Sequence, residues 1–120
     1  MKSPIIILLT TLLAACSGCS NREIQLRVKN VSLFQYDSLT VNTSGGEGFY
    51  GTVAFNQISE YKTFDFAYRY ALLKLYINDT AYMLQPIDYA GETKLKSGKY
   101  TYEINVNQVA REISLNCIKG

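Results

Sequence analysis

Apolar and polar residues alternate along most of the chain after residue 22, a two-residue period that is typical of β-strands with one buried face. In the first such segment Ile24, Leu26 and Val28 alternate with polar neighbours. Further strand-like segments follow in sequence order: 37–43, 49–55, 61–78, 80–87, 99–107 and 111–118. No segment has a convincing helical period. The pattern predicts a single all-β domain of seven or eight strands, built as an antiparallel two-sheet sandwich.

Three short segments predict how the strands are connected. The long segment 61–78 changes the parity of its apolar residues near Ala71, which predicts a bulge or a bend. Asn78-Asp79 lies between two apolar runs and predicts a tight hairpin. The stretch Gly46-Glu47-Gly48-Phe49-Tyr50-Gly51 spells a G-x-G-x-x-G motif. A dinucleotide site needs a helix after this motif, whereas here a strand follows, so we interpret it as a hairpin turn.

Residues 95–100, LKSGKY, precede the strand expected at 99–107. Leu95, Gly98 and Tyr100 resemble the tyrosine corner of Greek-key sandwiches, in which a tyrosine hydroxyl bonds to backbone a few residues upstream. An ordinary junction between a loop and a strand is the alternative. The resemblance implies an immunoglobulin-like or transthyretin-like sandwich.

The first twenty residues have the layout of an export signal. Lys2 precedes an apolar run at 5–13, which is shorter than the roughly 20 residues that a membrane-spanning helix needs. Leu13-Ala14-Ala15-Cys16 resembles the bacterial lipobox, which implies cleavage before Cys16, a diacylglycerol on its sulfur and an acyl chain such as palmitate on its amine. This interpretation divides the chain into a signal peptide (1–15), a lipidated tether (16–22) and a β-sandwich domain (23–120). The alternative is an ordinary signal cleaved after Ala15.

Much of the remaining chain resembles small lipoproteins of the Bacteroidetes that lack an assigned activity. The resemblance rests on residues 28–32, 59–62 and 84–89. It implies the bacterial cell envelope, with the outer membrane as the membrane that the anchor enters. In such bacteria an acidic cluster just after the lipidated cysteine often signals surface export. Residues 17–23, SGCSNRE, contain only one acid, Glu23, and this favours the periplasmic side slightly over the cell surface.

The two remaining cysteines form a possible pair. If Cys16 is acylated, Cys19 and Cys117 are left in an oxidising compartment. The first and last strands of immunoglobulin-like sandwiches often lie side by side, so we expect a Cys19–Cys117 disulfide. Two free thiols are the alternative.

Composition narrows the function classes. The chain has 12 basic and 10 acidic residues and no histidine. The near balance of charge argues against a nucleic-acid partner. Without histidine, the commonest general base and metal ligand is missing, and an enzyme would have to rely on carboxylates such as Asp65 and Asp88. We therefore expect a non-enzymatic protein without metal or cofactor.

Candidate interaction residues are few. Phe64, Phe66, Tyr68 and Tyr70 share one parity, and Tyr68, Arg69 and Tyr70 could stack on a sugar ring or anchor a protein. The alternative is that these rings fill the core. Asp37-Ser38-Leu39 and Asp79-Thr80-Ala81 resemble the O-glycosylation acceptor of exported Bacteroidetes proteins, which implies glycans on Ser38 and Thr80.

Together these features lead us to expect a lipid-anchored module that binds or scaffolds at the envelope. The alternatives are an accessory subunit that docks a partner by a sheet edge and a glycan-binding surface lipoprotein. The sequence does not indicate the oligomeric state.

Overall fold

The computed structural model describes residues 23–86 and 92–120. These residues form eight β-strands and include no helix that could cross a membrane. The strands are β1 (Ile24–Asn30), β2 (Ser38–Asn42), β3 (Glu47–Phe49), β4 (Lys62–Phe64), β5 (Leu72–Ile77), β6 (Thr80–Leu84), β7 (Gly98–Asn107) and β8 (Glu112–Lys119). The predicted signal peptide, the tether and the acylated Cys16 lie outside the described residues, as do Cys19 and Asp88.

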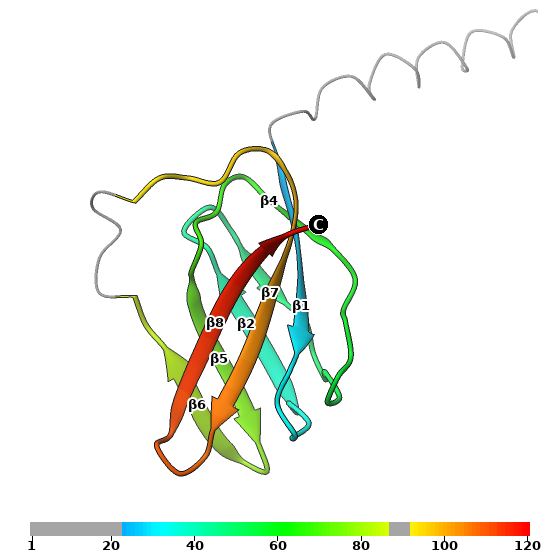
Figure 1. Ribbon diagram of the computed structural model, residues 1–120, viewed down its shortest axis with the longest axis vertical. Coiled ribbons are helices and arrows are strands. Elements are labelled where there is room, and N and C mark those ends of the chain that lie inside the picture. The colour runs from blue at the N-terminus through cyan, green and yellow to red at the C-terminus, as the bar shows by residue number, and fades with distance from the viewer. Residues whose placement is uncertain (1–22, 87–91) are drawn as a thin grey trace, which may run out of the picture.

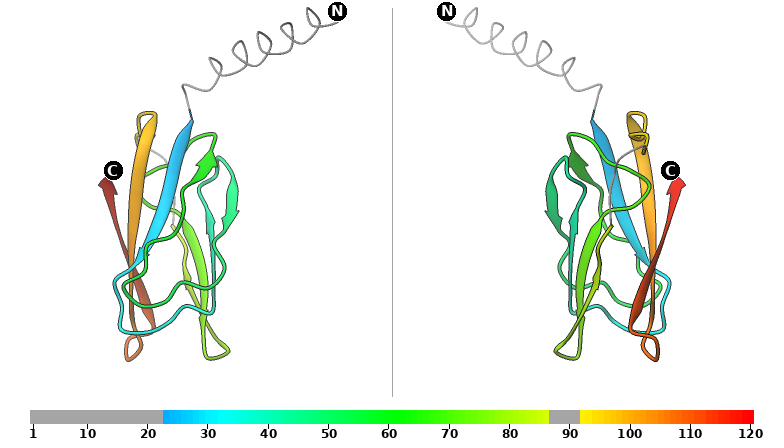
Figure 2. Two further views of the ribbon diagram at one scale, coloured as in Figure 1. Left: turned by 90° about the vertical axis from the view of Figure 1, so that its right-hand side faces the viewer. Right: turned by 90° about the vertical axis from the view of Figure 1, so that its left-hand side faces the viewer.

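The strands form two four-stranded sheets with the orders β4-β1-β7-β8 and β3-β2-β5-β6. The two sheets face each other (Figures 1 and 2), which confirms the predicted all-β sandwich. One pair departs from the antiparallel expectation, because β1 runs parallel to β7, with Ile24 opposite Gly98 and Asn30 opposite Ile104. Between β1 and β7 the chain forms β2 and β3 in the other sheet, β4 beside β1, and β5 and β6 in the other sheet again. It then enters β7 at the end where β1 begins, so β1 and β7 run in one direction.

The core lies between the sheets and follows the alternation seen in the sequence. In β1 every second residue, from Ile24 to Asn30, is buried. Leu39 and Val41 of β2 and Leu73 and Leu75 of β5 face them from the other sheet and have no exposed surface. Alternation places these side chains on one face of each strand, so a single apolar layer holds the two sheets together.

Two of the expected strands are interrupted. Residues 61–78 contain β4 and β5, which belong to different sheets, so the parity change near Ala71 lies where the chain crosses between the sheets. The strand expected over 49–55 was wrong for most of its length. Gly51 has a φ of 67°, a left-handed conformation that ends the strand, and beyond it only Val53 pairs, with Tyr36.

The turn predicted at Asn78-Asp79 is confirmed, whereas the glycine motif forms a turn only at Gly46, because Glu47–Phe49 are strand β3. Asn78 and Asp79 have φ values of 48° and 68°, as a two-residue type I′ hairpin requires. The glycine motif contributes to the β2–β3 hairpin, where the Thr43 amide donates to the Gly46 carbonyl at 3.0 Å. Gly45 lies in the same turn, and a Cβ there would overlap the backbone of Phe66.

The tyrosine corner is also present. The Tyr100 hydroxyl donates to the Lys96 carbonyl at 2.8 Å, and Leu95 packs against the core. This hydrogen bond fixes residues 96–100, where the chain enters β7.

Buried polar groups connect the loops at the opposite end of the sandwich. The Asn30 side-chain amide donates to the carbonyls of Phe34 (2.6 Å) and Val53 (3.0 Å). Its oxygen accepts from the amide and the hydroxyl of Ser32, at 2.9 and 2.7 Å. Every hydrogen-bonding position of this side chain is therefore used, although Asn30 is fully buried.

Candidate functional site

The predicted aromatic row does not form an open platform. Phe64 is only 2% exposed and belongs to the core, as the alternative interpretation expected. Phe66, Tyr68 and Tyr70 are half-buried. The rings of Phe66 and Tyr68 meet edge to face with their centroids 6.0 Å apart, and the Tyr68 carbonyl accepts from the Tyr102 hydroxyl at 2.6 Å. The row is thus largely taken up by packing, whereas Arg69, which lies between Tyr68 and Tyr70 in the sequence, is exposed.

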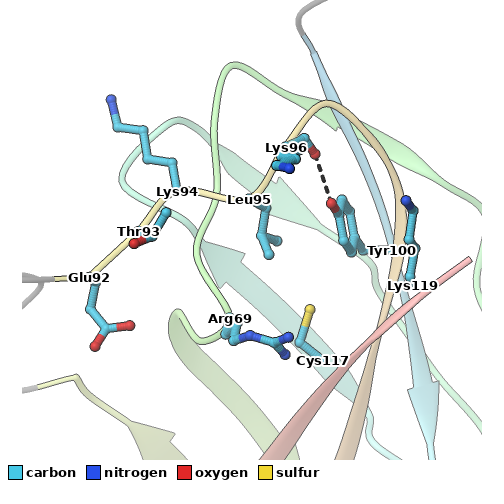
Figure 3. Close-up of a pocket in the computed structure, with 9 residues that line it drawn as sticks. All are labelled: Arg69, Glu92, Thr93, Lys94, Leu95, Lys96, Tyr100, Cys117 and Lys119. Atoms are coloured by element: carbon cyan, nitrogen blue, oxygen red, sulfur yellow. Dashed lines mark hydrogen bonds between the residues drawn. The ribbon is translucent and has the colours of Figure 1, made fainter.

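Arg69 extends over a hollow at the end of the sandwich where β7 begins and β8 ends. The hollow has a volume of about 480 Å³. Figure 3 shows the guanidinium group pointing from the β4–β5 crossover towards the Cys117 side chain. The hollow is lined by Arg69, Glu92, Thr93, Lys94, Leu95, Lys96, Tyr100, Cys117 and Lys119. It therefore joins three parts of the chain that are distant in sequence.

Residues 92–96 form one wall of this hollow and are held in place by two hydrogen bonds. The Leu95 amide donates to the Ala67 carbonyl at 2.9 Å, and the Tyr100 hydroxyl holds the Lys96 carbonyl. The Lys94 ammonium lies 4.2 Å from the centroid of the Phe66 ring, within cation–π range. The wall is thus attached to the crossover on one side and to β7 on the other.

The lining carries an excess of positive charge, with one arginine and three lysines against one glutamate. Burial raises the pKa of the Cys117 thiol, and the nearby charge of Arg69 opposes that shift without cancelling it. The thiol is therefore neutral near pH 7 and does not offset the cations. Of the side chains that line this hollow, sequence reasoning had singled out Arg69 as a binding candidate, Cys117 as a disulfide candidate, and Leu95 and Tyr100 as parts of the tyrosine corner. It had not connected Arg69 with Cys117. The two lie 48 positions apart, and no local motif connects them with Lys96 or Lys119.

The Cys19–Cys117 disulfide stays a prediction. Cys117 is a free, buried thiol in the structure, and Cys19 lies outside the described residues. The argument that the first and last strands lie side by side was wrong, because β7 lies between β1 and β8. The Cys117 side chain faces the hollow.

The other predicted positions are dispersed. Ser38 and Thr80 are half-buried at the starts of β2 and β6, and no structural feature tests their glycosylation. Asp65 is exposed after β4. Within residues 23–86 and 92–120, no three acidic or cysteine side chains gather as metal ligands would.

The second notable feature is the outer edge of β8. The strand pairs with β7 on one side over eight residues, from Glu112 to Lys119, without a bulge. The Gly120 amide donates to the Lys99 carbonyl, so these two residues form a hydrogen-bonded pair. In an antiparallel pair of strands, hydrogen-bonded and non-hydrogen-bonded residues alternate. It follows that residues 112, 114, 116 and 118 bond to β7. The backbone amides and carbonyls of residues 113, 115, 117 and 119 point away from the sheet.

The sheet edges differ in how far they are protected. β3 and β4 have three residues each and carry Glu47 and Lys62, and short, charged edges resist pairing with another strand. β6 has five residues. β8 has eight residues, and its charges lie only at the ends, at Glu112 and Lys119, so the six central residues ISLNCI are uncharged. Among the described strands, β8 thus offers the longest edge that could accept another strand.

Comparison with known proteins shows the fold alone. A protein from Eubacterium rectale, solved by NMR, superposes with a TM-score of 0.59 over 85% of this chain and 94% of its own, at 10% sequence identity. No family model and no curated protein matches the chain. The chain is therefore similar to that protein in its two-sheet sandwich, and the similarity assigns no activity.

Proposed function

We propose that this protein is a lipid-anchored, non-enzymatic docking subunit of the bacterial envelope, which receives an extended segment of a partner protein on the outer edge of β8. The anchor is the one that Leu13-Ala14-Ala15-Cys16 indicates. The observation that carries the proposal is the eight-residue edge with four outward amides and no central charge. Strand addition to such an edge is a common mode of peptide recognition.

The side chains of β8 suit this role. Ile113, Leu115 and Cys117 face inward, and Leu115 is half-buried at the margin of the core. An added strand would extend this margin with its own inward side chains, while its backbone would pair with residues 113, 115, 117 and 119. Affinity would come from the backbone bonds and specificity from the inward side chains. The half-buried state of Tyr68 and Tyr70 gives the aromatic glycan-binding alternative less support.

Hydrogen exchange tests the proposal with residue resolution. In the isolated protein, the outward amides of residues 113, 115, 117 and 119 should exchange faster than the paired amides of residues 114, 116 and 118. In complexes purified from the native membrane under mild conditions, the outward amides should slow at least tenfold, because strand addition gives each of them a hydrogen bond. If their exchange rates are the same with and without partners, the edge is not the docking surface.

A pair of variants tests specificity. Leu115→Lys places a charge that would be buried between the sheets when a strand is added, and it should abolish partner retention. Asn116→Lys adds the same charge on the outward face of the neighbouring residue and should retain the partner. Equal retention by both variants would contradict strand addition. Gel filtration of the purified protein shows whether the partner is a second copy of this chain. A dimer would then elute without any other protein present, whereas a different partner would be missing.

A further inference from the structure

We infer that the hollow lined by Arg69, Lys96 and Lys119 is a binding site for a small anionic ligand that carries a phosphate or carboxylate group. This site adjoins the C-terminal end of the outer edge of β8, because Cys117 and Lys119 line it. It opens between the β4–β5 crossover and residues 92–96 (Figure 3).

The first support is shape. A volume of about 480 Å³ lies within the usual 300–1,000 Å³ of small-molecule sites and accommodates a ligand about as large as a sugar phosphate or a uronic acid. Two hydrogen bonds hold residues 92–96 against the crossover and β7, so this wall is formed before any ligand arrives. A site that exists in advance does not lose affinity to the ordering of its walls.

The second support is charge. Arg69 lines the hollow, and among the described residues no carboxylate forms an ion pair with it. The guanidinium group presents paired N–H donors that match a carboxylate or a phosphate, and lysines add point charges. Lys119 and Lys96 approach from β8 and from residues 92–96, while Glu92 is the only acid in the lining. The neutral Cys117 thiol adds a weak donor at the base of the hollow and no negative charge.

Titrations with simple anions test the site in the mature, acylated protein held in an uncharged detergent. The probes are inorganic phosphate, glucose 6-phosphate, glucuronate and uncharged glucose, and calorimetry or amide chemical shifts report binding. We expect at least one anion to bind more tightly than glucose by tenfold or more, and the affinity should fall as salt is raised. If no anion binds at low salt, the proposal is wrong.

Two matched variants locate the binding. Arg69→Gln removes the exposed guanidinium group and should weaken the best anion about tenfold or more, since it removes charge-assisted hydrogen bonds. Lys74→Gln removes one charge from an exposed position on β5, outside the hollow, and should leave the affinity unchanged. Equal weakening by both would show non-specific attraction and would overturn the site. Thermal unfolding of both variants checks that the fold is retained.

The pH dependence separates the two chemical sources of the anion. The chain has no histidine, so no imidazole in the protein changes its charge between pH 5 and pH 8. Binding of glucose 6-phosphate should strengthen as its phosphate loses a second proton near pH 6, whereas binding of glucuronate should stay constant. Arg69→Gln and Lys74→Gln leave the backbone edge of β8 unchanged. A loss of anion binding in Arg69→Gln is therefore distinguishable from a loss of partner docking.

Discussion

Replacing Asn30 with alanine should destabilise the domain by at least about 4 kcal/mol, because this one side chain makes four hydrogen bonds, three of them buried. Three of its partner atoms, the carbonyls of Val53 and Phe34 and the hydroxyl of Ser32, keep another hydrogen-bond partner after the change. The Val53 carbonyl still accepts from the Tyr36 amide, and the Phe34 carbonyl still lies 3.2 Å from the Ser32 hydroxyl. Losing a bond under such conditions costs about 1 kcal/mol each time. The Ser32 amide is left without a partner at a residue that is 5% exposed, which costs about 1–3 kcal/mol more.

Urea-induced unfolding followed by circular dichroism measures this loss. For a domain of this size, about 4 kcal/mol corresponds to a fall in Tm of roughly 15 °C or more. The matched control is Asn116→Ala, which removes a single exposed bond to Glu103 and should change stability by less than about 0.5 kcal/mol. A loss below about 1 kcal/mol for Asn30→Ala would refute the reasoning, since it would show that the network contributes little.

Three further predictions concern hydroxyl and thiol groups. Tyr100→Phe removes the hydrogen bond to the Lys96 carbonyl, so it should lower the free energy of unfolding by about 1 kcal/mol and speed hydrogen exchange of the Leu95 amide. Unchanged exchange would contradict a role for this bond in holding residues 92–96. Burial raises the pKa of Tyr36 from 10.0 to about 12, so the unfolded chain loses this proton first and stability should decline between pH 10 and pH 12; in Tyr36→Phe, denaturation at alkaline pH should show a smaller decline. Mass mapping of the exported protein without reductant should recover a peptide that joins Cys19 to Cys117, and two freely alkylated thiols would exclude the bridge.

The sequence predicts most of the fold because local patterns determine most of its elements. The alternation in residues 24–28 requires one buried face, the Asn78-Asp79 pair supplies two left-handed residues, and the Leu95 to Tyr100 pattern carries its own hydrogen bond. The strand expected over 49–55 was wrong because Gly51 adopts a left-handed conformation, with a φ of 67°, that ends the extended chain. The alternation of apolar residues gives no sign of this conformation.

The candidate sites were less predictable, for a different physical reason. Arg69, Lys96 and Lys119 lie in three separate segments, and they line one hollow only once the β4–β5 crossover, residues 92–96 and β8 are brought together by the fold. The unpaired edge of β8 is likewise a property of strand order, since a strand that alternates in sequence looks the same at the centre of a sheet and at its edge.

The parallel alignment of β1 with β7 has a mechanical consequence. With the anchor and the β8 partner proposed above, a pulling force would enter the domain at Ile24 and leave it through β8, on the far side of β7. Such a load would slide β1 lengthwise past β7, and the hydrogen bonds between Ile24–Asn30 and Gly98–Ile104 would carry it together. Strands pulled apart from one end would instead lose their bonds one after another. The parallel pairing would thus help a small domain of the proposed kind resist a pull between a membrane and an attached assembly.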